Sequence, residues 1–295
     1  MKIIFLLFFY WINVSAVSSQ EISDTSIKPV VVPIGYNSSL DIVYTSVNNW
    51  EGKLDLYLPP NNNQKTPVII NIHGGGWNHG SKDQQGGFNP FLKAGFAVAN
   101  IEYRMTPQAT APAAIEDTRC AIIYLIKHAV ALNIDVNKII IMGGSAGGNL
   151  ALMGGLLGAN SIFDTNCLGI KNVKVAVIID KYGIADVWDW GYGKNITSKS
   201  ALTWLGDKKK DSSYAALVSP INYVTKLSPP TLIIHGDSDP TVPYQQSVEL
   251  FKKYQSVGVK SEFITVPGGL HGKFTKEKND ELNIAIMKFI TESIH

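Results

Sequence analysis

Short, wholly apolar runs alternate along the chain with longer segments whose apolar residues recur every three or four positions. The continuous runs predict strands that are buried on both faces of a sheet. They span residues 67–72, 96–101, 138–142, 174–179, 231–234 and 261–266. The segments with helical spacing predict helices. They span residues 112–132, 145–157, 243–257 and 276–294. Alternation of this kind predicts the α/β fold class, with a mainly parallel central sheet and helices on both faces.

Two parts of the chain depart from this rhythm. Residues 40–45 and 53–58 alternate apolar and polar positions, which predicts antiparallel strands ahead of the parallel ones. Residues 180–230 lack the strand–helix pattern and hold four large aromatic residues, Trp188, Trp190, Tyr192 and Trp204. We interpret this stretch as a small cap inserted over the carboxyl edge of the sheet.

The N-terminus has the pattern of a secretory signal peptide. Lys2 precedes an apolar run at residues 3–12 that is too short to span a bilayer as a helix, and Val14 and Ala16 supply small residues for cleavage. We therefore expect a signal peptide at 1–19 and one domain at 20–295 that includes the cap. This predicts secretion, to the periplasm or outside the cell, with no stable membrane anchor. An uncleaved anchor is the alternative.

Composition and charge narrow the function classes. The 295 residues are 45% hydrophobic and 17% charged, which suits a well-buried core, and the net charge is only +2. A near-neutral chain without a basic stripe argues against nucleic acid as a partner. Neither Cys120 nor Cys167 has the neighbours of a metal site, so we expect no metal and no cofactor. For Cys120 we favour a buried free thiol, with a disulfide to Cys167 as the alternative that export permits.

The strongest chemical signal is Gly-Gly-Ser-Ala-Gly at 143–147, an instance of G-x-S-x-G. It directly follows the predicted strand 138–142 and opens the predicted helix 145–157. A nucleophilic serine on a sharp, strained strand-to-helix turn needs this context. We therefore predict Ser145 as the nucleophile, with the amide of Ala146 as one donor to an oxyanion. A structural glycine turn is the alternative.

A second glycine-rich loop, His-Gly-Gly-Gly-Trp at 73–77, follows the buried strand 67–72. Glycines let the backbone approach a substrate, so that amide groups can stabilise a developing oxyanion. We predict Gly75 and Gly76 as the donors, with the Trp77 amide as a substitute. No phosphate-loop pattern is present, and we expect His73 to brace the loop.

The remaining partners of a serine triad are expected downstream, the acid before the histidine. His271 follows the last predicted strand, at an edge of the sheet where sites of α/β proteins form. It would accept the Ser145 proton, and an aspartate would orient and stabilise the imidazole. Asp237 and Asp239 both follow the strand 231–234. We favour Asp239, which lies further out, and keep Asp237 as the alternative that braces the turn.

Together these motifs resemble the α/β-hydrolase esterases, specifically bacterial feruloyl and acetylxylan esterases related to the hormone-sensitive-lipase group. The resemblance rests on 73–77, on the Tyr-Arg (103–104) and Glu-Asp (116–117) pairs, and on 143–148 and 235–243. It implies an α/β-hydrolase fold and a Ser145–Asp239–His271 triad. It also implies an oxyanion hole from the 73–77 loop and Ala146, with the two pairs bracing the site. Gly144 stands where the lipase branch usually has aspartate, which favours the feruloyl/acetylxylan branch.

These features predict a secreted serine carboxylic ester hydrolase that removes acetyl or feruloyl groups, with plant or algal polysaccharide as the expected carrier. We expect Trp77, Trp188 and Trp190 to bind substrate, although packing of the cap explains such residues equally well. The alternatives are a general short-chain carboxylesterase and a non-catalytic binding protein on a hydrolase scaffold. The partner would be a small ester or an esterified polysaccharide; the sequence leaves the oligomeric state open.

Overall fold

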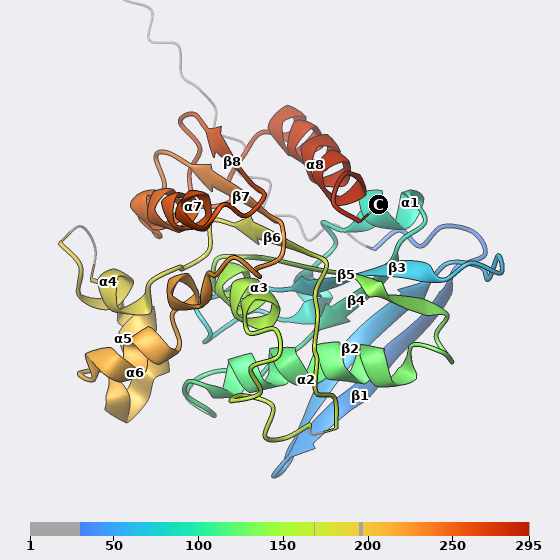
Figure 1. Ribbon diagram of the computed structural model, residues 1–295, viewed down its shortest axis with the longest axis horizontal. Helices are drawn as coiled ribbons and strands as arrows, with labels where there is room; N and C mark the ends of the chain where they lie inside the picture. Colours follow the sequence, from blue (N-terminus) through green and yellow to red (C-terminus); the bar gives the residue numbers. More distant parts are fainter. Residues whose placement is uncertain (1–29, 168, 195–196, 295) are drawn as a thin grey trace, which may run out of the picture.

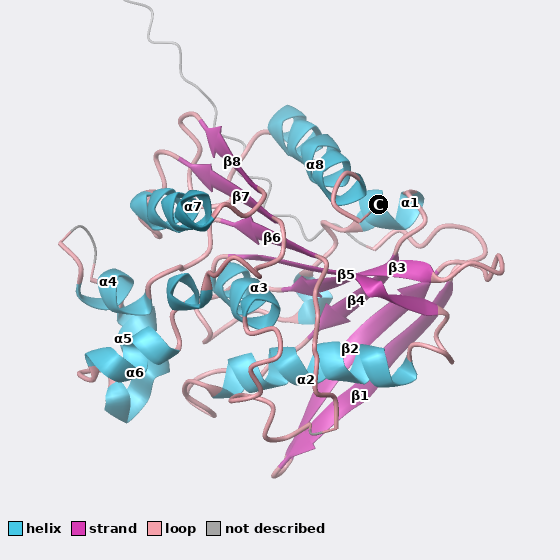
Figure 2. Cartoon of the chain, in the orientation of Figure 1, coloured by secondary structure: helices cyan, strands magenta, loops and turns pink. Residues whose placement is uncertain are grey.

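The computed structural model describes residues 30–167, 169–194 and 197–294. The predicted signal peptide lies outside these residues. An eight-stranded sheet in the order β1-β2-β4-β3-β5-β6-β7-β8 forms the centre (Figures 1 and 2). Its strands are β1 (Asn37–Val47), β2 (Trp50–Leu58), β3 (Thr66–Ile72), β4 (Ala97–Ile101), β5 (Ile134–Gly144), β6 (Val177–Lys181), β7 (Thr231–Gly236) and β8 (Ser261–Val266).

The strand directions match the two patterns in the sequence. β1 pairs with β2, and β2 with β4, in antiparallel register, whereas β4, β3, β5, β6, β7 and β8 pair in parallel. Every residue of β4 and β7 is buried, which explains their continuous apolar sequence. The predicted α/β fold with a mainly parallel sheet is thus confirmed, and the carboxyl ends of the parallel strands share one edge.

Helices cover both faces of the sheet. The larger core contains apolar side chains of α2 (Ala113–His128), α3 (Ala146–Leu156) and α7 (Gln245–Val257). The smaller core, on the opposite face, contains those of α1 (Asn89–Lys93) and α8 (Lys276–Thr291). Figure 1 shows α8 and α1 on the side of the sheet away from α2 and α3. Short 3-10 turns occur at Lys82–Gln84, Gly206–Lys208 and Pro220–Tyr223.

The stretch interpreted as a cap folds into three short helices, α4 (Val187–Tyr192), α5 (Lys199–Leu205) and α6 (Ser212–Leu217). They gather at one end of the molecule, beside the loops that leave the sheet (Figure 1). Side chains of Asp186, Ser198 and Asp211 accept a backbone hydrogen bond at the start of these helices. Most of the aromatic residues there pack inward, and Trp190 and Trp204 are buried.

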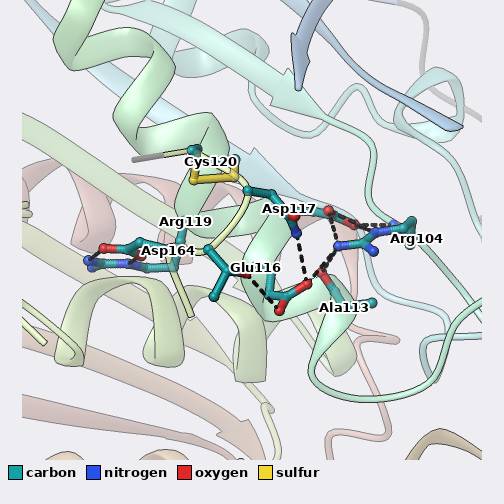
Figure 3. The surroundings of a disulfide bond; sticks show 10 residues. Arg104, Ala113, Glu116, Asp117, Arg119, Cys120 and Asp164 are labelled. Atoms are coloured by element: carbon teal, nitrogen blue, oxygen red, sulfur yellow. Dashed lines mark hydrogen bonds and ion pairs between the residues drawn. A yellow bond between two sulfur atoms is a disulfide. The ribbon is translucent and has the colours of Figure 1, made fainter. Parts of the chain in front are cut away.

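The two cysteines form a disulfide between α2 and the long loop after α3, so the expected free thiol is wrong (Figure 3). Next to Cys120, the buried Arg119 holds Asp164 of that loop through contacts of 2.7 and 2.8 Å. This ion pair returns the loop to α2 and brings Cys167 to Cys120. The apolar helical pattern around Cys120 indicated burial correctly, but it could not show which loop packs against the helix.

Candidate active site

Ser145 occupies a sharp turn between β5 and α3. Its backbone has φ +58° and ψ −123°, a conformation that is strained for a residue with a side chain. A Cβ on Gly143 would lie 2.1 Å from the Gly147 carbonyl oxygen, and one on Gly147 would lie 2.3 Å from the Ile72 carbonyl oxygen. Only glycine fits at these two positions. The tight packing of β3, β5 and α3 therefore holds the serine at the carboxyl edge of the sheet.

Two loops at the same edge bring an aspartate and a histidine to this serine. His271, after β8, places Nε2 2.9 Å from Ser145 Oγ. Its Nδ1 lies 2.6 Å from Oδ2 of Asp239, which follows β7. Ser145 and Asp239 are buried, whereas the His271 side chain is about one-fifth exposed. The three residues thus form a continuous hydrogen-bonded chain in the geometry of a serine triad.

Asp239 is held by more than His271. Its Oδ2 also contacts His235 Nε2 at 3.1 Å, and its Oδ1 accepts the amides of Thr241 and Val242 at 2.7 and 3.0 Å. Burial alone would raise the pKa of Asp239, but hydrogen bonds from the two histidines lower it well below its usual range. The carboxylate is therefore ionised and fixed in direction.

Asp237, the alternative acid, has a different environment. It is exposed, and its Oδ1 accepts a hydrogen bond from the Gly268 amide at 2.7 Å and from the Ser238 hydroxyl at 3.2 Å. These contacts tie the β7 loop to the β8 loop. The structure therefore places Asp239, and not Asp237, in contact with the His271 ring.

The glycine loop after β3 folds back toward Ser145. Gly75 and Gly76 have φ values of +114° and +55°, which favour glycine, and both line a cavity that also contains Ser145. A Cβ on Gly74 would lie 3.4 Å from Ser145 Cβ, so this loop passes next to the nucleophile. In the described part of the chain, the amides of Gly75, Gly76 and Ala146 donate to no protein acceptor. These are the donors that an oxyanion hole requires.

Side chains behind the loop fix its shape. His73 is buried, contacts the Gly74 carbonyl at 2.7 Å and Glu102 at 3.0 Å, and stacks on Tyr103. The Tyr103 hydroxyl donates to the His73 carbonyl at 3.1 Å. The neighbouring Arg104 pairs with Asp117 and Glu116 on α2 (Figure 3). These contacts attach the loop that follows β4 to both the glycine loop and α2.

The cavity measures about 510 Å³, enough for a small ester. Of the tryptophans expected to bind substrate, Trp190 alone lines it. Trp77 is fully buried and stacks on Trp204 at 4.0 Å between ring centroids, and Trp188 packs against Tyr192 at 4.4 Å. The expected contact is therefore wrong for Trp77, and Trp188 lies outside the lining of this cavity. The Trp77 backbone has φ +57°, and its ring packs in the larger core.

Among the cavity residues that sequence reasoning missed are Lys181 and Tyr182. The Tyr182 ring meets the His271 ring edge-on, 4.9 Å between centroids, and limits its movement. Burial raises the pKa of Tyr182 to about 12, so its hydroxyl stays protonated. The signal was present, because both residues stand at the carboxyl end of the strand next to β5. The expected strand ended at 179, which assigned them to the cap.

The fold and the site define the class of α/β-hydrolase esterases, and comparison with known proteins gives the family. The model of the BD-FAE family, the bifunctional feruloyl/acetyl xylan esterases, matches residues 54–254. The chain belongs to this family, which confirms the resemblance read from its motifs. Several curated relatives of the chain are also named as esterases, which agrees with this family.

Two solved structures and one curated protein illustrate these similarities. A truncated carbohydrate esterase from gut microbiota is 31% identical, with a TM-score of 0.77, over 90% of this chain and 100% of that one. A bifunctional GH43-CE protein of Bacteroides eggerthii is 28% identical, with a TM-score of 0.73, over 85% of this chain and 38% of that one. Esterase LipC of Mycobacterium tuberculosis is 27% identical over 70% of this chain, which spans about half (53%) of its length.

Proposed function

We propose that the protein is a serine esterase that removes acetyl or feruloyl groups from carbohydrate through an acyl-enzyme. The observation that carries this proposal is the chain of contacts from Asp239 through His271 to Ser145, at 2.6 and 2.9 Å, inside a cavity with free amides. A non-catalytic binding protein would have no use for a strained serine held against an oriented imidazole.

In the first half of the reaction, Ser145 Oγ attacks the ester carbonyl carbon while its proton passes to His271 Nε2. The negative charge that develops on the carbonyl oxygen is stabilised by the amides of Gly75, Gly76 and Ala146. Asp239 accepts the Nδ1–H of the imidazolium and stabilises its positive charge. His271 then gives its proton to the departing alcohol oxygen, and the acyl group remains on Ser145.

The second half repeats these steps with water. His271 takes one proton from the water, whose oxygen attacks the acyl carbon, and the ester bond to Ser145 breaks. The serine oxygen recovers a proton from His271, and a carboxylic acid leaves. Tyr182, edge-on to the ring, helps to keep the imidazole in one orientation throughout.

A carbohydrate ester is supported by the family and by the lining of the cavity. Trp190 is almost fully buried and reaches the cavity with only a small part of its side chain, and its Nε1 donates to the Thr241 carbonyl at 2.9 Å, which fixes its ring. Ser198, Ser200 and Thr241 add polar groups beside it. Hydroxyl and amide groups along the lining can exchange hydrogen bonds with a sugar, which supports a carbohydrate ester.

The direct test measures hydrolysis of nitrophenyl acetate by the wild type and by Ser145→Ala. We expect the substitution to lower kcat by roughly 10⁵-fold or more, since the members of a triad act as a unit. A panel of acetylated xylan, methyl ferulate and nitrophenyl butyrate then separates a carbohydrate esterase from a general short-chain carboxylesterase. Equal kcat/KM values on all three substrates would contradict the carbohydrate assignment.

We also propose that the protein is exported, on the basis of the N-terminal pattern alone. The segment lies outside the described residues, and in the described part no helix is long and apolar enough to cross a membrane. Expression with the native N-terminus, followed by N-terminal sequencing of the protein outside the cytoplasm, tests export. A mature protein that begins near residue 17–20 supports it, and retention of Met1 contradicts it.

A further inference from the structure

One charged side chain in the cavity has no part in the mechanism above. Lys181 is the last residue of β6 and lines the cavity together with Ser145. It pairs with Gly144 of the adjacent strand β5, and its carbonyl accepts the Ser145 amide at 2.9 Å. Lys181 therefore lies one strand away from the nucleophile, at the level where an ester would be attacked.

The pleat of the sheet gives the direction of this side chain. Asp180 points toward α3, because its Oδ1 would lie 2.5 Å from a Cβ on Gly148. Successive side chains of a strand point to opposite faces, so Lys181 points to the face that α1 and α8 cover. Ile179, two residues earlier, packs in the core on that face. At the open end of the strands, the same face carries Asn71, which also lines the cavity.

Among the described residues, none pairs with the ammonium group of Lys181. In the described part of the chain, no carboxylate or carbonyl oxygen lies within hydrogen-bonding distance of its Nζ, and burial lowers the pKa of Lys181. The buried Lys82 has a different environment. Its Nζ contacts Asp41, Asp55 and Asp83 at 2.9–3.0 Å. These three carboxylates raise the pKa of Lys82, although burial alone would lower it. Lys181 is half-buried, and a ligand that brings a carboxylate to its ammonium would stabilise a charge that burial disfavours.

The other residues around the cavity do not balance this charge. Among the described residues that line it, Lys181 is the only lysine or arginine, and none is aspartate or glutamate. Gln84 and Gln85 extend the polar wall on one side, and Ser198 and Ser200 face the cavity on the other. A ligand with a carboxylate would meet a cation that no lining carboxylate pairs with, and the ionised Asp239 stands behind the His271 ring, outside the lining.

We propose that Lys181 determines specificity by binding a carboxylate of the substrate, which makes an ester on an acidic, uronate-bearing saccharide the preferred substrate class. This inference rests on the proposed esterase function of the same cavity. A sugar hydroxyl would also accept a hydrogen bond from the ammonium, but it would leave the charge uncompensated. A carboxylate accepts the hydrogen bond and also compensates the charge, and charge-assisted hydrogen bonds are about twice as strong as neutral ones.

The test compares two substrates that differ only in this charge, the acetyl esters of methyl glucuronoside and of methyl glucoside. kcat/KM is measured on both at low ionic strength for the wild type, Lys181→Met, Lys181→Arg and Lys226→Met. Methionine keeps the length and apolar stem of the side chain without its charge, and arginine keeps the charge. Lys226 is exposed and outside the cavity lining, so its substitution changes the net charge equally and serves as the control.

We expect the wild type to prefer the acidic ester by about tenfold, which corresponds to one charge-assisted contact. Lys181→Met should bring the ratio of the two kcat/KM values close to one, through loss on the acidic ester, while Lys181→Arg and Lys226→Met keep the preference. No preference in the wild type, or a ratio unchanged in Lys181→Met, overturns the proposal. Failure of the wild type on both esters, or activity that survives in Ser145→Ala, contradicts the esterase function itself. Melting temperatures show whether each variant is folded.

Discussion

Two buried aspartates at the ends of neighbouring strands have opposite environments. Asp239, after β7, accepts hydrogen bonds or contacts from two histidines and two backbone amides. Within the described ranges, Asp180, at the end of β6, accepts one hydrogen bond, from the Gly183 amide at 3.1 Å, and its Oδ2 has no protein partner. The number of hydrogen-bond donors decides whether the pKa of the buried carboxyl group is lowered or raised. Donors lower the pKa of Asp239 below its usual range, whereas burial raises the pKa of Asp180 to about 7.

The comparison shows that two carboxyl groups at the same edge of the sheet can have different roles. An ionised Asp239 can stabilise a positive imidazole ring, which the proposed reaction needs twice. Asp180, whose pKa is raised by burial, packs between α3 and the loop after β6, where a Cβ on either Gly148 or Gly183 would approach its Oδ1 within 2.5 Å. Burial alone therefore does not mark a catalytic carboxylate; the donors around it do.

Among the substitutions that test this comparison, Asp239→Asn has the largest expected effect. The variant keeps an oxygen for the Thr241 and Val242 amides but places a neutral group against His271, so the imidazolium loses its counter-charge. We expect kcat on nitrophenyl acetate to fall by about 10³- to 10⁴-fold, as in other triads. Circular dichroism and the melting temperature check that the fold is kept. A fall of less than tenfold would remove Asp239 from the proposed triad.

A smaller effect is expected at His235, which contacts Asp239 Oδ2 at 3.1 Å and Ser247 Oγ at 2.7 Å without touching Ser145. His235→Phe removes one hydrogen-bond donor to an ionised oxygen, a contact worth about 1.5–3 kcal/mol. Part of this loss should appear as a less well oriented Asp239. We expect kcat to fall roughly tenfold with little change in KM.

His235→Gln provides the control for this positioning role, because its amide can restore a donor toward Asp239. It should recover part of the lost kcat. An equal loss in both variants, accompanied by an equal loss of melting temperature, would indicate packing alone.

The sequence was informative about Asp239 and much less so about Asp180. Ser145, Asp239 and His271 follow apolar runs at strand ends, and all parallel strands end at one edge, so their meeting could be predicted. The pattern placed the end of β6 at 179, whereas the strand runs through Lys181. This shift hid the alternation that turns Asp180 toward α3 and Lys181 toward the cavity.

Side-chain direction in loops was the other missing information. Trp77 follows the three glycines of the substrate-facing loop, and nothing in the local sequence shows that its ring packs into the core against Trp204. The sequence left the disulfide undecided for a similar reason. Its formation depends on Arg119 and Asp164, which are 45 residues apart. Both features depend on contacts between distant segments, which local patterns do not encode.

Asp180 itself gives a prediction for stability. Its folded-state pKa of about 7 lies above the ordinary value of 3.8, so the native protein keeps a proton that the unfolded chain releases. The free energy of unfolding that this group contributes is therefore complete below pH about 4 and is lost as the pH rises to about 7. Asp180→Asn, neutral at every pH, should remove this loss.

Urea unfolding of the wild type and of Asp180→Asn at pH 5 and pH 7.5 measures the effect. The stability of the wild type relative to the variant should decrease between these pH values by on the order of 2 kcal/mol. Activity should change little at pH 7, because Asp180 does not contact the triad. A relative stability that is constant with pH would mean that Asp180 is ionised when folded, and the contrast with Asp239 would then fail.

The smallest effect is expected at Asp237, two residues before Asp239. Asp237→Asn keeps the oxygen that accepts the Gly268 amide, and the side chain is exposed, so the turn between the β7 and β8 loops should survive. We expect kcat/KM within about twofold of the wild type and unfolding free energy within about 0.5 kcal/mol. Activity measurements on this variant and on Asp239→Asn together show which of the two aspartates is the acid of the triad. If Asp237→Asn were the inactive one, the loop would have to rearrange before catalysis, and the donors around Asp239 would serve structure alone.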